Sequence, residues 1–422
     1  MIASTAVALD RDRLLDWYRR NRERSAKIFA LINDDAYETR PIALRHPFVF
    51  YEGHLPAFSF LTLNARALRE PSVDAEFEHI FERGIDPGSP DDAQRLTRAS
   101  WPSREAVERF GRACDERVEA ALRHATLVDA DVPRLVRGQA VYTMLEHEHM
   151  HHETLLYIVH QLDYAKKGRI AQSHHDRAIA QNQLRAIDAG IATLGADRDE
   201  LLFGWDNEFG RHEVGVPAFS MQQFPVTNGD WLAFVARGGP VPHFWLERGG
   251  DFLLRGVFEE LPLPQSWPVF VTHAQAAAYA AWAGMRLPTE AEYDRAAYGT
   301  PSGTDRPYPW GDDEPTPLRG NFDFARFDAE PVDEHEAGAS AWGIYDLIGN
   351  GWEWTSTIFE PFPGFVPMAS YPPYSSDFFD GRHYVMKGAS PATARELIRR
   401  SFRNWFYDDY PYMYAKFRCV AD

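Results

Sequence analysis

The sequence changes character near residue 190, and this change constrains the fold more than any other feature. Residues 10–165 carry apolar side chains at helical spacing, and the segment 132–162 has no glycine after Gly138 and no proline after Pro133. Beyond residue 190 glycine and proline are frequent, and aromatic residues stand in short segments between turns. We therefore expect an α+β protein. Its expected parts are a helical bundle over 1–165, a linker over 166–190 and an irregular, loop-rich α+β domain over 191–422.

Local patterns in the second half predict a few regular elements. Residues 231–235 and 274–283 are expected to be helical because apolar residues follow one another there without glycine or proline. Short apolar stretches bounded by turn residues favour strands. We expect strands over 216–226, 269–273 and 384–388.

The overall charge limits the kinds of partner. The formal net charge is −18, which argues against nucleic acid and anionic membranes, because both require a basic surface. The chain has no run of about 18 apolar residues, and Met1–Asp12 lacks the pattern of a signal peptide. Its two cysteines, Cys114 and Cys419, fit a reducing compartment. We expect a cytoplasmic protein whose partners are small molecules; the sequence does not indicate its oligomeric state.

The strongest chemical signal is a histidine-rich run from Leu145 to Glu153. His147 and His151 are four residues apart on an expected helix, so their side chains share one face at about 5–6 Å between Cβ atoms. Such a pair commonly presents two imidazoles to one metal. His149 is about 200° away round the helix and cannot join them. The same run also matches the H-E-x-x-H pattern of zinc metalloproteases, with Glu148 as the base.

A third candidate ligand is His54, which stands in a stretch of aromatic and apolar residues. A buried imidazole needs a partner, and a metal would provide one. Three neutral imidazoles would leave coordination positions open for O₂ and a substrate, as non-haem Fe(II) chemistry requires.

At this point the chain resembles the sulfoxide synthases of ergothioneine biosynthesis over nearly its whole length. The resemblance implies a DinB-like bundle followed by a domain similar to formylglycine-generating enzymes. It also implies that iron is held by His54, His147 and His151. The second half carries the matching stretches in the family's order: residues 224–228, 285–293, 308–311, 342–350, 351–355 and 417–420.

The resemblance also implies roles for residues near the C-terminal end. Tyr371 matches a catalytic tyrosine that delivers a proton or a hydrogen atom. Tyr374 matches a tyrosine of the betaine pocket, and Asn404 and Trp405 match a pair that contacts the betaine. An aromatic face suits its trimethylammonium group through cation–π attraction.

Three positions depart from the family members that use γ-glutamylcysteine. Phe406 replaces an aspartate that meets the donor's amino group, only Arg83 stands in the loop that clamps the donor's carboxylates, and Met150 replaces a glutamine that contacts the betaine. Unpaired carboxylates in a cleft are costly, whereas a sugar stacks well on aromatic faces. The departures favour the related selenoneine synthases, which use a selenosugar.

The expected reaction is therefore O₂-dependent C–Se bond formation between a selenosugar and the imidazole carbon of hercynine, with Fe(II) as cofactor. The first alternative is an ergothioneine-type synthase that forms a C–S bond with a thiol donor. More distant alternatives are a zinc metalloprotease, a non-enzymatic binding module and a formylglycine-generating type of oxidase. The last needs two nearby cysteines, and the second half has only Cys419. A structural Ca²⁺ ion in the second domain is left open.

Overall fold

The computed structural model describes residues 9–82, 101–178 and 181–422. Its contacts divide the chain into two compact units. The first comprises Met1–Ile170 together with the short segment Met368–Pro372, and the second comprises Ala171–Pro367 and Pro373–Asp422. The α+β fold class expected from the sequence is confirmed, because helices dominate the first unit and the strands belong to the second.

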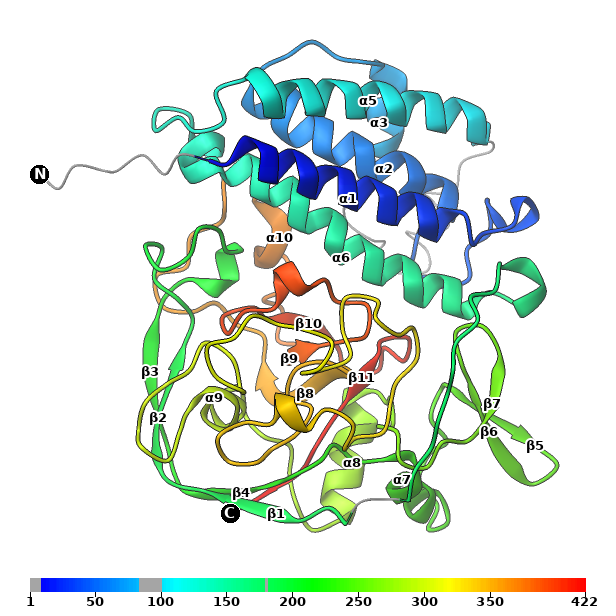
Figure 1. The fold of residues 1–422 in the computed structure, drawn as a ribbon, viewed down its shortest axis with the longest axis vertical. Helices are drawn as coiled ribbons and strands as arrows, with labels where there is room; N and C mark the ends of the chain where they lie inside the picture. Colours follow the sequence, from blue (N-terminus) through cyan, green and yellow to red (C-terminus); the bar gives the residue numbers. More distant parts are fainter. Residues whose placement is uncertain (1–8, 83–100, 179–180) are drawn as a thin grey trace, which may run out of the picture. The chain divides into compact units, whose positions relative to one another are not determined.

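The first unit is a bundle in which four long helices run side by side (Figure 1). Helix α2 packs against α5 and α6, and α1 packs against the same two helices. The bundle's helices are α1 (Arg11–Phe29), α2 (Phe48–Phe60), α3 (Ala75–Phe81), α5 (Arg104–His124) and α6 (Gln139–Gln161), with 3₁₀ turns η1 (Asp34–Ala36), η3 (Pro133–Gly138) and η4 (Tyr164–Lys166).

Local signals set the helix ends. The Asp10 side chain accepts a hydrogen bond from the backbone N–H of Arg13, and Ser103 does the same for Ala106, so α1 and α5 begin at ordinary N-caps. Helix α6 begins after Gly138, whose positive φ of 73° is a backbone conformation that glycine adopts readily. Helix α2 contains Pro56 and continues as a π-helix, η2 (Leu61–Ala67).

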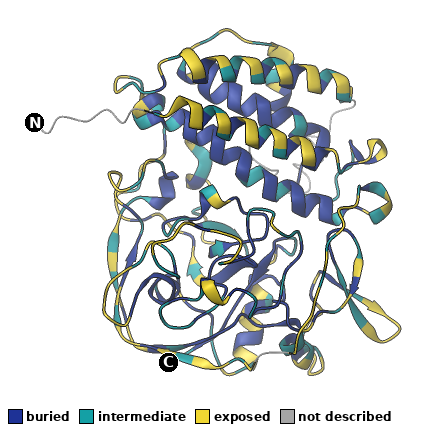
Figure 2. Ribbon diagram, viewed as in Figure 1, coloured by how far each residue is buried: buried dark blue, intermediate teal, exposed yellow. Residues whose placement is uncertain are grey.

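Burial separates the helices into an inner and an outer pair. In Figure 2, α2 and α6 are dark blue along most of their length, whereas α1 and α5 carry exposed residues. Twelve of the 13 residues of α2 are buried. The polar side chains of these inner helices therefore need partners within the protein, which makes their histidines informative.

The second unit is built on a four-stranded sheet in the order β10-β9-β8-β11. Strands β8, β9 and β10 are antiparallel, and β11 is parallel to β8. Smaller sheets have the orders β1-β4-β12, β2-β3 and β5-β6-β7. Helix α9 packs against β2, β3, β8 and β9.

The elements of the second unit have the following bounds. The helices are α7 (Asn228–Val235), α8 (His273–Trp282), α9 (Glu290–Tyr298) and α10 (Pro373–Ser376), with 3₁₀ turns η5 (Asp206–Glu208), η6 (Glu336–Gly338) and η7 (Arg395–Leu397). The strands are β1 (Leu184–Ile187), β2 (Gly190–Leu194), β3 (His212–Val216), β4 (Phe219–Gln222), β5 (Trp245–Arg248), β6 (Asp251–Arg255), β7 (Glu260–Pro262), β8 (Gly351–Ile358), β9 (His383–Ala389), β10 (Asn404–Tyr407), β11 (Ala415–Lys416) and β12 (Val420–Ala421).

A buried ion pair ties two of the sequence motifs together. Arg418, in the closing stretch of the chain, is fully buried and its Nε donates to Glu353 of β8 at 2.8 Å. Its terminal nitrogens donate to the same carboxylate and to backbone carbonyls, including Tyr345 O at 2.7 Å. A buried guanidinium requires such complete pairing. These motif residues therefore hold the fold together.

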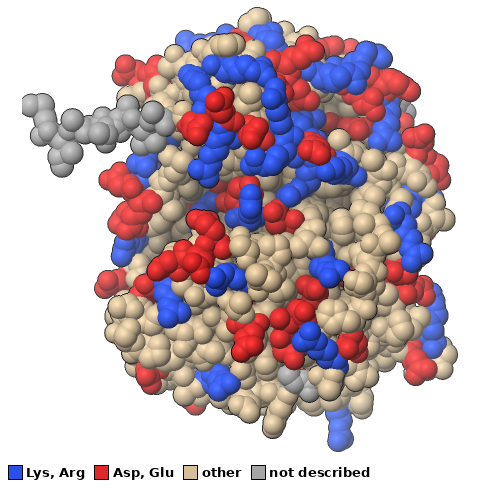
Figure 3. Space-filling view, viewed as in Figure 1, with Lys and Arg blue, Asp and Glu red and all other residues tan. Residues whose placement is uncertain are grey.

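The surface charge is mixed, although the formal net charge is −18. The face drawn in Figure 3 carries Lys and Arg side chains interspersed with Asp and Glu, so the acidity is not one continuous patch there. Among the described helices, none combines the length and the apolar character that crossing a bilayer requires.

Candidate metal centre

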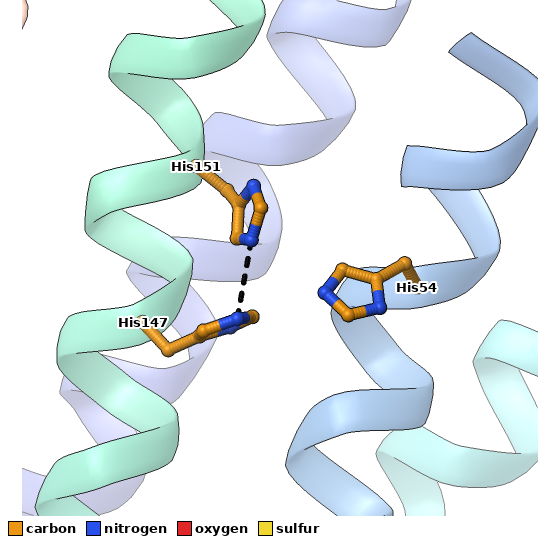
Figure 4. A group of neighbouring side chains, drawn as sticks. All are labelled: His54, His147 and His151. Carbon is orange, nitrogen blue, oxygen red and sulfur yellow. Dashed lines mark hydrogen bonds between the residues drawn. The ribbon is translucent and has the colours of Figure 1, made fainter. Parts of the chain in front are cut away.

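Three histidines of the first unit converge on one point. His147 and His151 project from α6 toward His54 of α2, and all three rings turn into the space between the two helices (Figure 4). One nitrogen of each lies within 4.8 Å of the others. The Nε2 atoms of His147 and His151 are 3.1 Å apart. In the part of the chain that the structure describes, no other group of three His, Cys, Asp or Glu side chains meets this spacing.

A hydrogen bond to one ring nitrogen fixes the orientation of His54. Its Nδ1 lies 2.8 Å from the carbonyl oxygen of Phe81, the last residue of α3. Because a carbonyl oxygen only accepts, Nδ1 carries the proton, and in the neutral ring Nε2 keeps its lone pair. A ligating imidazole typically makes such a bond through its second nitrogen.

The protonation states of the other two rings also favour metal binding. Burial, the largest cause, lowers the pKa of His147 well below its usual value of 6.5, and the adjacent His151 and His54 lower it further. Burial and the neighbouring His54 likewise lower the pKa of His151. Both rings are therefore neutral at physiological pH, which is the form that ligates a metal.

These residues fit a mononuclear transition-metal ion. At a metal–nitrogen distance of about 2.1 Å, two ligands at right angles lie about 3 Å apart, close to the 3.1 Å between the Nε2 atoms of His147 and His151. Three imidazoles are a borderline-soft donor set that suits iron and its neighbours in the first transition row. They also leave positions for exogenous ligands.

Two aromatic residues stand beside the histidines. The ring of Phe58, one turn after His54, stacks on His147 at 3.4 Å between centroids and 8° between planes. The ring of Tyr371 meets Phe58 edge-on at 5.3 Å and lies 6.1 Å from His147. The sequence reasoning missed Phe58, although its i+4 spacing from His54 places both on one helix face.

Tyr371 reaches the histidines because its short segment is anchored to α6. The backbone N–H of Ser370 donates to Gln139 at 3.0 Å, and its hydroxyl lies 2.7 Å from that of Thr143. Both partners are on α6, the helix that carries two of the candidate ligands. The structure therefore brings Tyr371 and the three histidines together, as predicted.

The opposite face of α6 carries a separate polar network. Glu148 accepts hydrogen bonds from Arg22 at 2.8 Å and from Ser25 at 2.6 Å, both on α1. His149 Nε2 accepts from the indole N–H of Trp17 at 2.7 Å, so His149 faces away from the metal centre as expected. Because Glu148 is engaged by α1, this arrangement gives no support to the metalloprotease alternative.

The predicted betaine-binding residues belong to an aromatic cluster of the second unit. Tyr374 stacks on Trp205 at 3.9 Å and meets Trp405 edge-on at 5.3 Å. Trp405 stacks in turn on Phe359 at 4.1 Å. Asn404 is half-buried at the start of β10 and precedes Trp405 directly. Trp205 was not foreseen, because it lies about 170 residues before Tyr374 in the sequence.

The other predicted substrate contacts are placed as follows. Phe406 is half-buried on β10, and its ring stacks on Tyr410 at 5.1 Å. Met150 is half-buried on α6. Arg83 lies outside the described residues. The roles of these three residues stay predictions.

The thiol of Cys419 is not suited to oxidase chemistry. It is fully buried, and burial raises its pKa to about 12. The other cysteine, Cys114, belongs to α5 of the first unit. The structure thus offers no reactive pair for the formylglycine-generating alternative, in agreement with the sequence analysis.

Comparisons with known proteins agree with this two-part organisation. Residues 18–155 match the DinB superfamily, and residues 172–422 match the sulfatase-modifying factor enzyme 1-like domain. The chain is 35% identical over 337 residues to a hercynine oxygenase of Mycolicibacterium thermoresistibile, covering 72% of this chain and 73% of that protein. It is 40% identical over 241 residues to the hercynine oxygenase of Mycobacterium tuberculosis, covering 52% and 55%.

A fungal relative extends the comparison along nearly the whole chain. Ergothioneine biosynthesis protein 1 of Neurospora crassa is 29% identical over 488 residues, covering 91% of this chain and 54% of that protein. The chain thus spans about half the length of two of these three relatives. The match to the sulfatase-modifying factor enzyme 1-like domain takes in more than half of the chain, and one bacterial relative is matched over most of both lengths. The chain therefore belongs to the hercynine oxygenase family, and its DinB-superfamily region precedes its sulfatase-modifying factor enzyme 1-like domain.

Proposed function

We propose that the protein is an O₂-dependent non-haem iron enzyme that joins a selenium or sulfur donor to the imidazole carbon of hercynine. One observation carries the proposal: three imidazoles meet at one point beside the phenol of Tyr371. The names of the relatives supply the acceptor, hercynine, and the donor set supplies the metal class.

The metal would be held by His54, His147 and His151. When bound, Fe(II) supplies the redox chemistry that activates O₂ and positions the donor's selenium or sulfur. The protein's own groups do the rest. Phe58 covers one face of His147 and keeps it in a ligating orientation, and Tyr371 holds a proton at its hydroxyl near the reacting atoms.

The acceptor is expected to use the aromatic cluster of the second unit. Hercynine carries a permanent trimethylammonium group, which binds aromatic faces through cation–π attraction. Tyr374, Trp405 and Asn404 provide two aromatic rings and one amide for it.

For the donor we propose a selenosugar. The residue after the Asn404–Trp405 pair is Phe406, stacked on Tyr410, where a charged donor would require a carboxylate. An aromatic face of this kind suits the C–H face of a sugar. A thiol donor, giving an ergothioneine-type product, is the second candidate, because the relatives are hercynine oxygenases and ergothioneine biosynthesis proteins.

The test is a reconstitution under anaerobic conditions. The protein is loaded with Fe(II) and hercynine, and O₂ is then admitted with a selenosugar, γ-glutamylcysteine or cysteine in parallel. Mass spectrometry of the products identifies the donor that is coupled. We expect coupling of the selenosugar; coupling of γ-glutamylcysteine alone would refute the donor assignment, and no coupling of any donor would refute the activity.

A matched pair of variants tests the metal centre itself. His147→Ala and His151→Ala should each lose Fe(II) and coupling together, because each removes one of three ligands. His149→Ala is the control, since His149 lies on the same helix but binds Trp17 instead. Unchanged iron content in His147→Ala would show that the metal, if any, binds elsewhere.

A further inference from the structure

The second unit contains a cleft that shares no residue with the metal centre or with the aromatic cluster. Its volume is about 480 Å³, within the range of about 300–1,000 Å³ usual for small-molecule sites. Three segments line it: residues 193–196 at the end of β2, residues 305–308, and residues 399–401. Leu201 and Arg211 complete the wall together with Glu200.

Most of the charges in this cleft are already neutralised. Arg399 donates from Nε to Glu208 at 2.8 Å and from a terminal nitrogen to the same carboxylate at 2.5 Å. Arg400 pairs with Asp305 at 2.7 Å. Arg211 pairs with Glu200. These pairs hold three arginines in the wall as fixed structure.

Arg306 differs from the other arginines of the cleft. It is half-buried, and across residues 9–82, 101–178 and 181–422 no carboxylate lies within ion-pairing distance of it. Among the described residues, the Arg306 side chain donates one long hydrogen bond, 3.5 Å, from Nη1 to the carbonyl oxygen of Pro309. In a chain of net charge −18, a guanidinium without an acidic partner in a cleft is a candidate site for an anion, because its parallel N–H groups match the oxygens of a carboxylate or a phosphate.

The surroundings of Arg306 define what kind of anion fits. Tyr308, two residues on, is half-buried, and its ring lies parallel to that of Trp310 at 5.3 Å and 7°. Pro307 and Leu201 add apolar surface. One uncompensated positive charge matches one negative charge, and the apolar and aromatic wall matches a hydrocarbon body.

We infer that this cleft binds a small organic monocarboxylate, whose carboxylate pairs with Arg306 and whose apolar body lies against Tyr308. The guanidinium offers two parallel N–H donors to the two carboxylate oxygens. The site is independent of the proposed reaction, since none of its lining residues is a candidate metal ligand or a member of the aromatic cluster.

The test is calorimetric titration of the full-length protein with phenylacetate, which combines one carboxylate with one aromatic ring. Phenylacetamide, its neutral counterpart, and inorganic phosphate are titrated in parallel. We expect saturable binding of phenylacetate and at least tenfold weaker binding of both comparison compounds. Equal binding of phenylacetamide would overturn the ionic part of the inference, and preferential binding of phosphate would overturn the ligand class.

Variants locate the binding. Arg306→Gln should weaken phenylacetate binding at least tenfold, whereas Arg237→Ala, which removes an exposed arginine outside the cleft, should leave it unchanged. Leu201→Trp fills the cleft without touching a charge and should also abolish binding, which keeps the test decisive if the Arg306 variant does not fold. Binding that survives both changes would place the carboxylate elsewhere and refute the site.

Discussion

The stacking of Phe58 on His147 gives a prediction that separates metal binding from general stability. The two rings are nearly parallel, with 3.4 Å between their centroids and 8° between their planes. Replacing Phe58 by leucine keeps an apolar side chain but removes the flat face, so that the imidazole of His147 is free to rotate. Aromatic pairs contribute about 0.5–1.5 kcal/mol beyond their buried area. We therefore expect Phe58→Leu to weaken Fe(II) binding about 2- to 12-fold, at about tenfold per 1.4 kcal/mol.

Phe60 provides a matched control on the same helix. It is fully buried, whereas Phe58 is 4% exposed, so the two leucine variants lose similar volumes from the core. The Phe60 ring lies 5.9 Å from the guanidinium of Arg117, and none of its described ring contacts is with His54, His147 or His151. Both variants should therefore lose similar free energy of unfolding, but only Phe58→Leu should lose affinity for the metal.

The assay is an anaerobic titration with Fe(II) against a competing chelator, repeated with Co(II), whose visible bands report the ligand field. Urea unfolding of the metal-free proteins measures the loss of stability separately. If Phe58→Leu and Phe60→Leu weaken metal binding equally, the effect is one of bundle stability, and the stacked ring has no specific part in positioning His147. Unchanged affinity in Phe58→Leu would contradict the reasoning directly.

Three further predictions test the site and the fold around it. Tyr371→Phe should keep its edge contact with the neighbouring ring and bind Fe(II) normally, but should lose most of the coupling activity, measured by product formation over a pH series. Arg22→Ala should lower the free energy of unfolding in urea by about 3–5 kcal/mol, because it leaves the buried Glu148 carboxylate without its cation; the double change Arg22→Met with Glu148→Leu should recover most of this loss. Burial alone would lower the pKa of His335, but its hydrogen bond to Glu330 and the nearby carboxylates raise that pKa above 6.5. The contribution of the His335–Glu330 pair to stability is therefore complete below pH 6.5. It is lost as the pH rises through the folded-state pKa. His335→Gln should therefore destabilise the protein in urea melts at pH 6 and have little effect at pH 8.5, and an equal effect at both would rule out a charged His335.

The expectations that depended on local pattern were the more successful ones. The helices expected over 231–235 and 274–283 correspond to α7 and α8, and the strand expected over 384–388 lies within β9. The strand expected over 216–226 was wrong in its bounds, because Val216 ends β3 and only Phe219–Gln222 forms β4. Residues 269–273 do not form a named strand, and His273 instead begins α8 behind an N-cap threonine, Thr272. Cap chemistry there outweighs the apolar run.

The site shows the same division between local and distant information. Helical spacing predicted the pairing of His147 with His151, and the structure confirms that both rings turn to one side. Nothing in the sequence indicates that Phe81 would fix the tautomer of His54, because the two residues are 27 positions apart. The same holds for Trp205 and Tyr374, which are 169 positions apart and stack on each other in the structure.

The two faces of α6 explain why this histidine run yields one metal centre instead of several. A helix advances about 100° per residue, so alternate members of the run point in different directions. His147 and His151 turn toward His54 of α2. Glu148 and His149 turn toward α1, where Arg22 donates a hydrogen bond to Glu148 and Trp17 donates one to His149. Arg22 and Ser25 of α1 both donate hydrogen bonds to Glu148, and this pairing fixes the rotation of α6. That rotation in turn aims the two ligands at the third. The pairing of Glu148 with α1 is thus a condition for the metal centre. Its loss in Arg22→Ala should weaken Fe(II) binding as well as stability, whereas His149→Ala leaves this pairing in place.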